Sequence, residues 1–267
     1  MITSVNNDRV KKVVSYIEKS KARREGDVFV IEGMKMLREA PVLQVREVYV
    51  TEKFLDSAGE DDKEILWRYG AEPVSEEVMK KMAATQTPQG VLAVIRQYHY
   101  TEEEVIEGYN ETDKDAAPLI LILENIQDPG NLGTMLRSGE GAGVTGIILS
   151  KGSADIYNPK VIRSTMGSIF RMPFIYVENV PEMLKKLHAS GISTYAAHLK
   201  GTRNYDEFDY TKPTAFLIGN EGNGLTKETA DAAGEYILIP MKGEVESMNA
   251  ATSSAILTFE ASRQRRS

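Results

Sequence analysis

Short apolar runs alternate with amphipathic stretches throughout the second half of the chain. Leu119-Ile-Leu-Ile-Leu123 is apolar at every position, which is typical of a parallel strand covered on both faces. The alternation predicts an α/β domain with a parallel sheet. We expect strands at residues 119–123, 146–150, 171–177, 193–198, 214–218 and 236–239, and helices at 131–140, 159–169, 181–189, 226–233 and 247–263.

The first 97 residues alternate in the same way and predict a smaller α/β/α sandwich. We expect strands at residues 28–32, 46–51 and 90–96 and helices at 8–19, 34–39, 61–69 and 75–82. Residues 98–117 are charged, lack the apolar periodicity of a core element and are interpreted as a linker. The chain is therefore divided into an N-terminal domain (1–97), the linker (98–117) and a C-terminal domain (118–267).

Composition limits the chemistry that this chain can perform. The 267 residues contain no cysteine, which excludes disulfides, a thiol nucleophile and cysteine-ligated metals. The three histidines, His99, His188 and His198, lack metal-ligand spacing, so no metal site is expected. The N-terminus has no apolar h-region and no run approaches bilayer-spanning length, which predicts a soluble, cytoplasmic protein without a membrane partner.

Charge is distributed unevenly along the chain. The net charge is −7, yet basic residues crowd the first 38 positions, and the acidic excess lies largely at residues 60–64 and 102–115. A local basic face is what phosphate binding requires, whatever the sign of the total charge. An ordinary solvated surface explains the same composition. The candidates for contacts to a nucleic acid are Lys21, Arg23, Arg24, Lys35 and Arg38.

Three blocks rich in polar residues and glycine each stand where an apolar strand meets a helix. Such junctions meet at one edge of a parallel sheet, which is where α/β folds bind ligands. Glycines in the second block allow its backbone to approach a ligand closely, and the last two blocks suit an adenosine held by backbone groups. The blocks are Asn125-Ile-Gln-Asp-Pro-Gly-Asn131-Leu-Gly133-Thr-Met-Leu-Arg137, Gly219-Asn220-Glu221-Gly222-Asn223-Gly224-Leu225, and Ile239-Pro240-Met241 continuing to Ser247-Met248-Asn249.

The literal G-x-G-x-x-G at residues 141–146 is a different case. A dinucleotide-binding loop follows a strand and opens a helix, so that the phosphate meets the helix N-terminus. Here a helix ends near Glu140 and a strand begins near Gly146, which places the partial negative charge of a helix C-terminus at the loop. We interpret these glycines as a helix C-cap and a tight turn.

Each motif block also has a purely structural explanation. Asp128-Pro-Gly-Asn131 is a turn followed by an Asn N-cap, and Ser247 suits the N-cap of the last helix. A lone helical arginine such as Arg137 is usually solvated. The hypothesis of a site therefore depends on the three blocks occurring together and in this order.

In this order the blocks resemble those of the SpoU-type (TrmH-like) RNA 2′-O-ribose methyltransferases of the SPOUT superfamily. The resemblance is carried by N-x-x-D-P-G-N-x-G-x-x-x-R, G-N-E-G-x-G and I-P-M…S-x-N, and Arg163-Ser164-Thr-Met-Gly167-Ser168 is similar to the family's middle motif. Phe29-Val-Ile-Glu-Gly33 and Thr87-Pro-Gln-Gly90 resemble the ribosomal-protein-L30e-like substrate-binding domain. Met248 stands where the family usually has leucine, a volume-conserving exchange.

The resemblance implies a deep trefoil knot in the C-terminal domain and a homodimer that completes the active site. It also implies S-adenosylmethionine as methyl donor, held by Leu217, Gly219, Asn220, Glu221, Gly222, Ile239, Pro240, Met241, Ser247 and Met248. The residues that match the family's catalytic set by position are Asn131, Arg137, Glu221, Ser247 and Asn249.

The implied reaction transfers a methyl group to a ribose 2′-hydroxyl of RNA. The appended N-terminal domain favours ribosomal RNA, specifically 23S RNA, over transfer RNA as the substrate. The family proposal makes the Arg137 equivalent a general base, although a guanidinium with a pKa above about 12 rarely gives up its proton. Electrostatic stabilisation and phosphate anchoring fit the motif equally well, with Ser247 and Asn249 positioning ribose or phosphate. A non-catalytic RNA-binding protein and a base methyltransferase are the alternatives.

Overall fold

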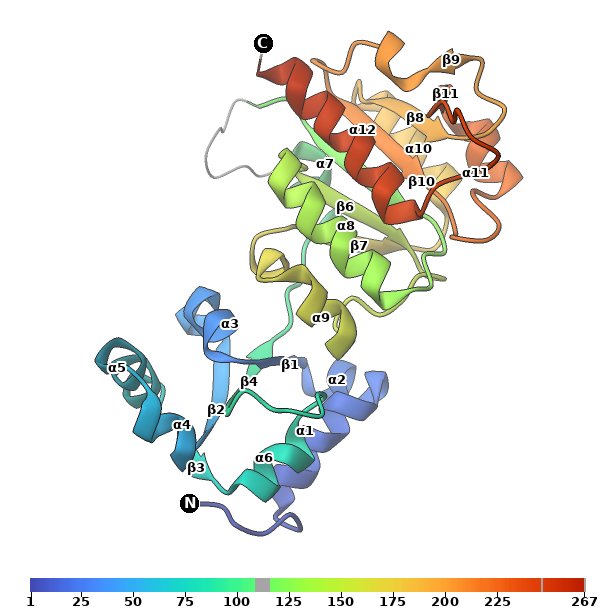
Figure 1. The fold of residues 1–267 in the computed structure, drawn as a ribbon. Coiled ribbons are helices and arrows are strands. Elements are labelled where there is room, and N and C mark those ends of the chain that lie inside the picture. Colours follow the sequence, from blue (N-terminus) through green and yellow to red (C-terminus); the bar gives the residue numbers. More distant parts are fainter. Residues whose placement is uncertain (109–115, 246, 267) are drawn as a thin grey trace. The chain divides into compact units, whose positions relative to one another are not determined.

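Figure 1 shows the computed structural model of the chain, which describes residues 1–108, 116–245 and 247–266. The chain forms two compact units. The first comprises Met1–Tyr98 and Asp155–Phe170, and the second comprises His99–Ala154 and Arg171–Ser267. None of the helices within the described ranges is long and apolar enough to cross a membrane.

The first unit is built on a four-stranded sheet. β4 is antiparallel to both of its neighbours, and β3 pairs in parallel with β2 at the edge. In sheet order the strands are β1 (Val28–Glu32), β4 (Val91–Arg96), β2 (Val45–Thr51) and β3 (Glu72–Val74). The helices of residues 1–98 are α1 (Asp8–Glu18), α2 (Ser20–Gly26), α3 (Met34–Glu39), α4 (Glu52–Ser57), α5 (Glu60–Arg68) and α6 (Glu76–Met82), with a 3-10 turn, η1, at Val42–Gln44.

Apolar side chains of α1 and α6 bury one face of this sheet. Val13 of α1 and Met79 of α6 pack in one cluster with Val30 and Val94 of the strands. The strands and helices predicted for this region are confirmed to within one residue at each end. The sequence does not predict α2, α4 or β3, because each is seven residues long or shorter and shows no apolar periodicity.

Residues 155–170 cluster with the first unit, although the sequence assigns them to the C-terminal domain. The ring of Tyr157 stacks on that of Phe29 in β1, with the two centroids 4.8 Å apart. The ring centroid of Phe170 lies 6.3 Å from that of Phe29. The helix predicted for residues 159–169 is shorter in the structure. α9 (Pro159–Thr165) ends where Met166 and Gly167 adopt positive φ angles of 51° and 101°, and a 3-10 turn, η2 (Ser168–Phe170), follows.

The second unit contains the predicted parallel sheet, and every strand pairing described for it is parallel. Its seven strands lie in the order β7-β6-β5-β10-β8-β11-β9. The strands are β5 (Leu119–Leu123), β6 (Gly146–Ser150), β7 (Phe174–Val177), β8 (Ser193–Ala197), β9 (Arg203–Asn204), β10 (Thr214–Ile218) and β11 (Glu235–Leu238). The helices are α7 (Glu102–Glu107), α8 (Pro129–Ala142), α10 (Val180–Ala189), α11 (Lys227–Ala232) and α12 (Ala250–Arg265), with a 3-10 turn, η3, at Tyr205–Glu207.

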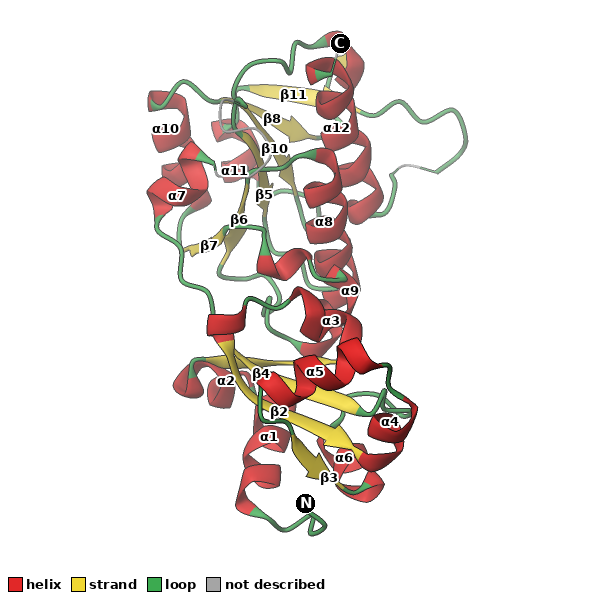
Figure 2. Cartoon of the chain, turned by 90° about the vertical axis from the view of Figure 1, so that its left-hand side faces the viewer, coloured by secondary structure: helices red, strands yellow, loops and turns green. Residues whose placement is uncertain are grey.

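Helices cover both faces of the seven-stranded sheet (Figure 1 and Figure 2). α8 and α12 pack side by side on one face. The other face carries α7, α10 and α11, whose Val105, Leu184 and Ala230 pack with Ile122 and Leu217 in one core cluster. The predicted α/β class is confirmed, whereas the trefoil knot stays a prediction.

The expectation that residues 98–117 lack a core element is wrong for α7. The hydroxyl of Thr101 accepts a hydrogen bond from the backbone N–H of Glu104, whose carboxylate accepts one from Thr101 N–H, so the two residues form a capping box. Val105 of this helix is fully buried in the core cluster. One apolar position in a short acidic helix is too weak a pattern to be recognised. Residues 109–115 of the predicted linker lie outside the described residues.

Both ends of α8 and the start of α12 test the capping predictions. α8 is capped by Asp128, whose Oδ1 accepts from Asn131 N at 2.7 Å, so Asn131 is inside the helix and is not its cap. The cap of α12 is Asn249 instead of Ser247. Proline at the first position of α8 explains the earlier start, because its fixed φ suits that position. Gly143 forms the predicted left-handed C-cap of α8, with φ at 87°.

Candidate active site

The three motif blocks begin at the carboxyl ends of β5, β10 and β11. β10 pairs directly with β5, and β8 lies between β10 and β11. Because all of these strands are parallel, the segments that follow them leave the sheet at the same edge. Sheet topology therefore brings together residues that lie as far apart in the sequence as Asn131 and Asn249, which are separated by 118 positions.

The second block, Gly219–Leu225, folds into a closed turn. Asn220 and Gly224 exchange backbone hydrogen bonds of 3.0 and 2.9 Å, and the Asn220 side-chain oxygen accepts from Gly222 N and Asn223 N, each at 3.0 Å. A Cβ atom at Gly219 would lie 2.1 Å from the backbone of Gly224 and Leu225. Glycine is therefore required at position 219 by the packing of the turn on itself, before any ligand is considered.

A chain of hydrogen bonds joins the three blocks. The Glu221 carboxylate accepts from the backbone N–H groups of Gln127 and Asp128 at 3.1 and 3.0 Å and from the Asn131 side-chain amide at 3.1 Å. The Asn131 side-chain oxygen accepts in turn from the Asn249 amide at 3.0 Å. The structure thus brings together Asn131, Glu221 and Asn249, three of the five residues predicted to be catalytic.

The hydrogen bonds of Glu221 keep its carboxylate ionised. Partial burial raises the pKa of Glu221, but the hydrogen bonds from Asp128 and Gln127 lower it by more, so its pKa lies below the ordinary value of 4.5. At neutral pH the group is an acceptor with no proton to donate. Glu221 is therefore suited to orient the Asn131 amide and is unsuited to act as a general acid.

A cavity of about 320 Å³ lies beside this network. Glycines of the second block bring backbone groups to its wall, and Ile218, Ile239 and Met248 add apolar surface. A pocket that combines apolar side chains with convergent backbone groups suits a nucleoside. The residues that line it are Ala197, His198, Leu199, Ile218, Gly219, Asn220, Glu221, Gly222, Asn223, Gly224, Leu225, Ile237, Leu238, Ile239, Met241, Ser247, Met248, Ala250 and Ser253.

Two residues predicted to hold the cofactor do not line this cavity. The Leu217 side chain is fully buried on the α10 face of the sheet, because neighbouring positions of a strand point to opposite faces. Pro240 is exposed and outside the lining. The other predicted residues, Gly219, Asn220, Glu221, Gly222, Ile239, Met241, Ser247 and Met248, all line the cavity.

The part of the cavity wall at the end of β8 is not predicted from the sequence. His198 stacks on Tyr236 with the ring centroids 4.7 Å apart, and its Nδ1 accepts from Lys200 N at 3.1 Å. With Ala197 and Leu199 it closes one side of the cavity. The available signal was that these residues lie at the end of a predicted strand or directly after it, but the position of β8 between β10 and β11 is not a local property of the sequence.

Arg137 lies outside the hydrogen-bond network of its own chain. The side chain is exposed on α8, and it makes no hydrogen bond or ion pair with any residue that the structure describes. A guanidinium keeps its charge at any physiological pH. Arg137 is therefore an available cation on the helix that also carries Asn131.

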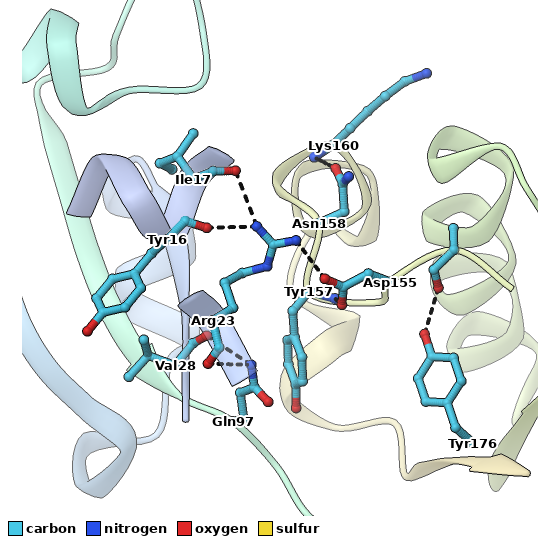
Figure 3. Close-up of polar contacts among 11 residues, drawn as sticks. Tyr16, Ile17, Arg23, Val28, Gln97, Asp155, Tyr157, Asn158, Lys160 and Tyr176 are labelled. Atoms are coloured by element: carbon cyan, nitrogen blue, oxygen red, sulfur yellow. Dashed lines mark hydrogen bonds and ion pairs between the residues drawn. The ribbon is translucent and has the colours of Figure 1, made fainter. Parts of the chain in front are cut away.

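The prediction that Arg23 contacts RNA is wrong, because its side chain is only 4% exposed. The guanidinium donates to the backbone oxygens of Tyr16 and Ile17 at 2.7 and 3.2 Å and to the Asp155 carboxylate at 2.6 Å (Figure 3). The two oxygens belong to the last turn of α1, where helix carbonyls lack intrahelical partners. Arg23 thus satisfies the end of α1 and holds residue 155 within the first unit.

The four other basic candidates are exposed, and their contact with RNA stays a prediction. Arg38 lies 2.6 Å from the Asp62 carboxylate, and Lys21 lies 3.7 Å from that of Glu25. Exposed pairs of this kind are weak and can exchange partners. Arg24 and Lys35 have no ion pair with a described residue and are the more accessible cations of the set.

Replacement of Arg23 and of its exposed neighbour Arg24 should separate folding from RNA binding. Arg23→Met should lower the free energy of unfolding by about 3 kcal/mol, because Asp155 and two helix carbonyls lose their partner. Arg24→Met should change it by less than about 0.5 kcal/mol and instead weaken RNA binding, more at low salt than at high salt. Urea unfolding and fluorescence anisotropy with a labelled RNA measure the two effects. Equal stability of the two variants would contradict the assignment of Arg23.

The contribution of Glu221 to stability should depend on pH. A carboxyl with a lowered pKa stabilises the folded state above the unfolded-state pKa, and this stabilisation is lost as the pH falls through the folded-state value. Glu221→Gln should therefore be less stable than wild type at pH 7, and the difference should shrink below pH 4.5. Urea unfolding over a pH series measures it. The control is Glu228→Gln on α11, an exposed position that should leave stability at pH 7 nearly unchanged.

Comparison with known proteins matches both parts of the chain. Residues 118–259 match the SpoU rRNA Methylase family, and residues 7–93 match the MRM3-like substrate binding domain. The 23S rRNA (guanosine(2553)-2′-O)-methyltransferase RlmP of Bacillus subtilis is 31% identical, with 97% of each chain covered. An uncharacterized tRNA/rRNA methyltransferase of Synechocystis is 32% identical over 98% of this chain and 93% of its own.

Solved structures are similar over nearly the whole length of the chain. The rRNA methyltransferase of Sinorhizobium meliloti superposes with a TM-score of 0.83 at 30% identity, covering 98% of this chain and 96% of that one. The SpoU methyltransferase AviRb of Streptomyces viridochromogenes, in complex with the cofactor AdoMet, gives 0.84 at 25% identity and covers 98% and 99%. Two of the motif blocks line one cavity, the first block is hydrogen-bonded to both of them, and the family match covers more than half of the sequence, so the chain belongs to the SpoU methylase family.

Proposed function

We propose that this protein transfers a methyl group from S-adenosylmethionine to a ribose 2′-hydroxyl of RNA. The observation that carries the proposal is the hydrogen-bond chain Glu221–Asn131–Asn249, which joins the three family motifs beside a nucleoside-sized cavity. Membership of the SpoU methylase family supports it.

The cavity residues fit the methyl donor. Backbone groups of the Gly219–Leu225 turn are suited to the hydrogen-bonding edges of adenosine, and Ile218, Ile239 and Met248 offer apolar surface to its ring. When bound, S-adenosylmethionine supplies an electrophilic methyl group. Neighbouring structures from Sinorhizobium meliloti and Streptomyces viridochromogenes contain AdoMet, which supports the same ligand here.

The motif side chains have distinct roles in this proposal. Glu221 stays ionised and orients Asn131, and Asn249 both caps α12 and binds Asn131. Ser247 lines the cavity and is not needed as a cap, so its hydroxyl is available to ribose or phosphate. Arg137 would stabilise the developing alkoxide or anchor a phosphate, because an exposed cation without a partner suits both tasks.

A homodimer is part of the proposal. Arg137 makes no contact with the Asn131–Glu221–Asn249 network of its own chain in the residues that the structure describes. A second copy that presents its α8 to the site would bring the missing cation. The half-exposed Phe259 on α12, the helix beside α8, offers apolar surface for such a contact.

Ribosomal RNA is the proposed substrate, and the cytoplasm the proposed location. The support for 23S RNA comes from RlmP, which is similar over nearly its full length, and from the substrate-binding match of residues 7–93. Transfer RNA is the alternative, because other relatives are named tRNA/rRNA methyltransferases.

Arg137→Ala should lower the turnover of RNA methylation on the order of 10²- to 10³-fold while S-adenosylmethionine affinity stays within a factor of two, because the proposed role lies in the transition state. Single-turnover transfer of a labelled methyl group and calorimetry measure the two quantities. Arg137→Lys keeps the charge without the two-pronged geometry and separates electrostatic from bidentate recognition. Thr134→Ala, on the exposed side of the same helix, is the control. Turnover of Arg137→Ala within tenfold of wild type would remove Arg137 from the mechanism.

The methylated atom should be the ribose 2′-oxygen. The test is in vitro modification of ribosomal RNA, digestion to nucleosides and mass spectrometry of the fragments after glycosidic cleavage. The added methyl mass should remain with the sugar. If it stays with the base, the protein is a base methyltransferase of the same fold, and if no methyl group is transferred while RNA is bound, it is a binding protein.

A further inference from the structure

A buried carboxylate directly precedes the first motif block, contacts residues on either side of the second, and has no role in the proposed chemistry. Glu124 directly follows β5 and is 5% exposed. Its two oxygens accept hydrogen bonds from Thr226 N at 2.7 Å, from the Thr226 hydroxyl at 2.9 Å and from the Thr229 hydroxyl. A buried carboxylate is retained only where donors of this kind satisfy it.

These contacts place Glu124 at both ends of the cavity-lining turn. Its backbone N–H donates to Ile218 O at 2.9 Å, at the residue that precedes the turn. Its side chain holds Thr226, at the residue that follows the turn. One residue therefore spans the gap that Gly219–Leu225 must bridge.

The next residue contributes a third point of attachment. Asn125 O accepts from the Asn220 side-chain amide at 2.8 Å, and Asn125 has a left-handed backbone with φ at 55°. The hydrogen bonds inside the turn close it on itself without fixing its place on the sheet. The turn contains three glycines, and glycine loses more conformational freedom on ordering than any other residue. Its position therefore depends on anchors outside it.

We propose that Glu124 is a positioning residue that holds the Gly219–Leu225 turn in the conformation that receives S-adenosylmethionine. This inference rests on the proposed cofactor site. Without the Glu124 carboxylate, the turn would become ordered only when the ligand binds. The free-energy cost of that ordering would weaken binding. A carboxylate accepts from all three donors at once. In glutamine the NH₂ group would either face the Thr226 N–H, which is also a donor, or force both hydroxyls to turn and accept.

The experiment compares S-adenosylmethionine binding by Glu124→Gln, Thr226→Val and Thr226→Ser with that of wild type, in the full chain. Glu124→Gln and Thr226→Val should raise the Kd roughly tenfold, the size expected when a hydrogen bond to a charged group is lost. Thr226→Ser keeps the hydroxyl and should bind as wild type does. The Thr226 hydroxyl also caps α11 by accepting from Thr229 N, so Thr226→Val removes that cap as well. Thr229→Val removes only a hydroxyl donor to Glu124, so it keeps the test valid if another variant fails to fold, and it should raise the Kd in the same way.

The matched control is Thr145→Val. Thr145 is a buried residue whose hydroxyl bonds with the backbone of Leu119, at the opposite end of β5 from Glu124. The Thr145→Val variant should have a lower free energy of unfolding than wild type, while its Kd for S-adenosylmethionine stays unchanged. A second readout is hydrogen exchange in the ligand-free protein, where the amides of Gly222, Asn223 and Gly224 should exchange faster in Glu124→Gln than in wild type or Thr145→Val.

Each outcome decides one question. Weaker binding with faster exchange of the turn supports the positioning role. Unchanged binding by both Glu124→Gln and Thr226→Val overturns it, and so does an equal loss of binding in Thr145→Val, which would make the effect one of general destabilisation. If wild-type protein itself fails to bind S-adenosylmethionine, the proposed cofactor is wrong, and the inference about Glu124 falls with it.

Discussion

Parallel pairing of β5 with β10 is the constraint on which the second unit depends. The register places Leu123 opposite Ile218, so the two strands end at the same level and the segments that follow them start side by side. Every residue of both strands is buried, and a shift in register would draw the polar residues at the strand ends into the core. The contacts that Glu124, Asn125 and Glu221 make across the two loops all require this alignment.

The cavity-lining turn combines a glycine-rich interior with a rigid frame. Glycines keep side chains out of the cavity, but a glycine-rich segment alone populates many conformations. Two carboxylates restrict it: Glu124 holds the residues on either side, and Glu221 reaches from the turn to the backbone at the start of α8. Backbone donors fix the ionisation of Glu221, so the orientation of the Asn131 amide persists across the neutral pH range.

The sequence predicts those features that depend on local pattern. Strands such as β5 and β10 are apolar throughout, and the motif blocks carry their own spacing, so both are found without a structure. Features that depend on contacts with distant residues cannot be found in this way. Leu217 adjoins a motif, but strand alternation turns its side chain toward α10. The sequence shows Arg23 only as one of several basic residues. The structure shows that its guanidinium binds the end of α1 and Asp155. The wall after β8 requires the strand order, which crossover connections determine over long separations.

The segment Asp155–Phe170 has a consequence for shortened forms of the chain. Residues on both sides of it belong to the second unit, so the polypeptide passes from one unit to the other at 98/99, 154/155 and 170/171. Neither unit is a continuous stretch of sequence. Loss of the first 98 residues would strip the partner from the apolar side of α9, including Val161 and Ile162. A chain shortened at this point would therefore expose apolar surface that the full chain buries.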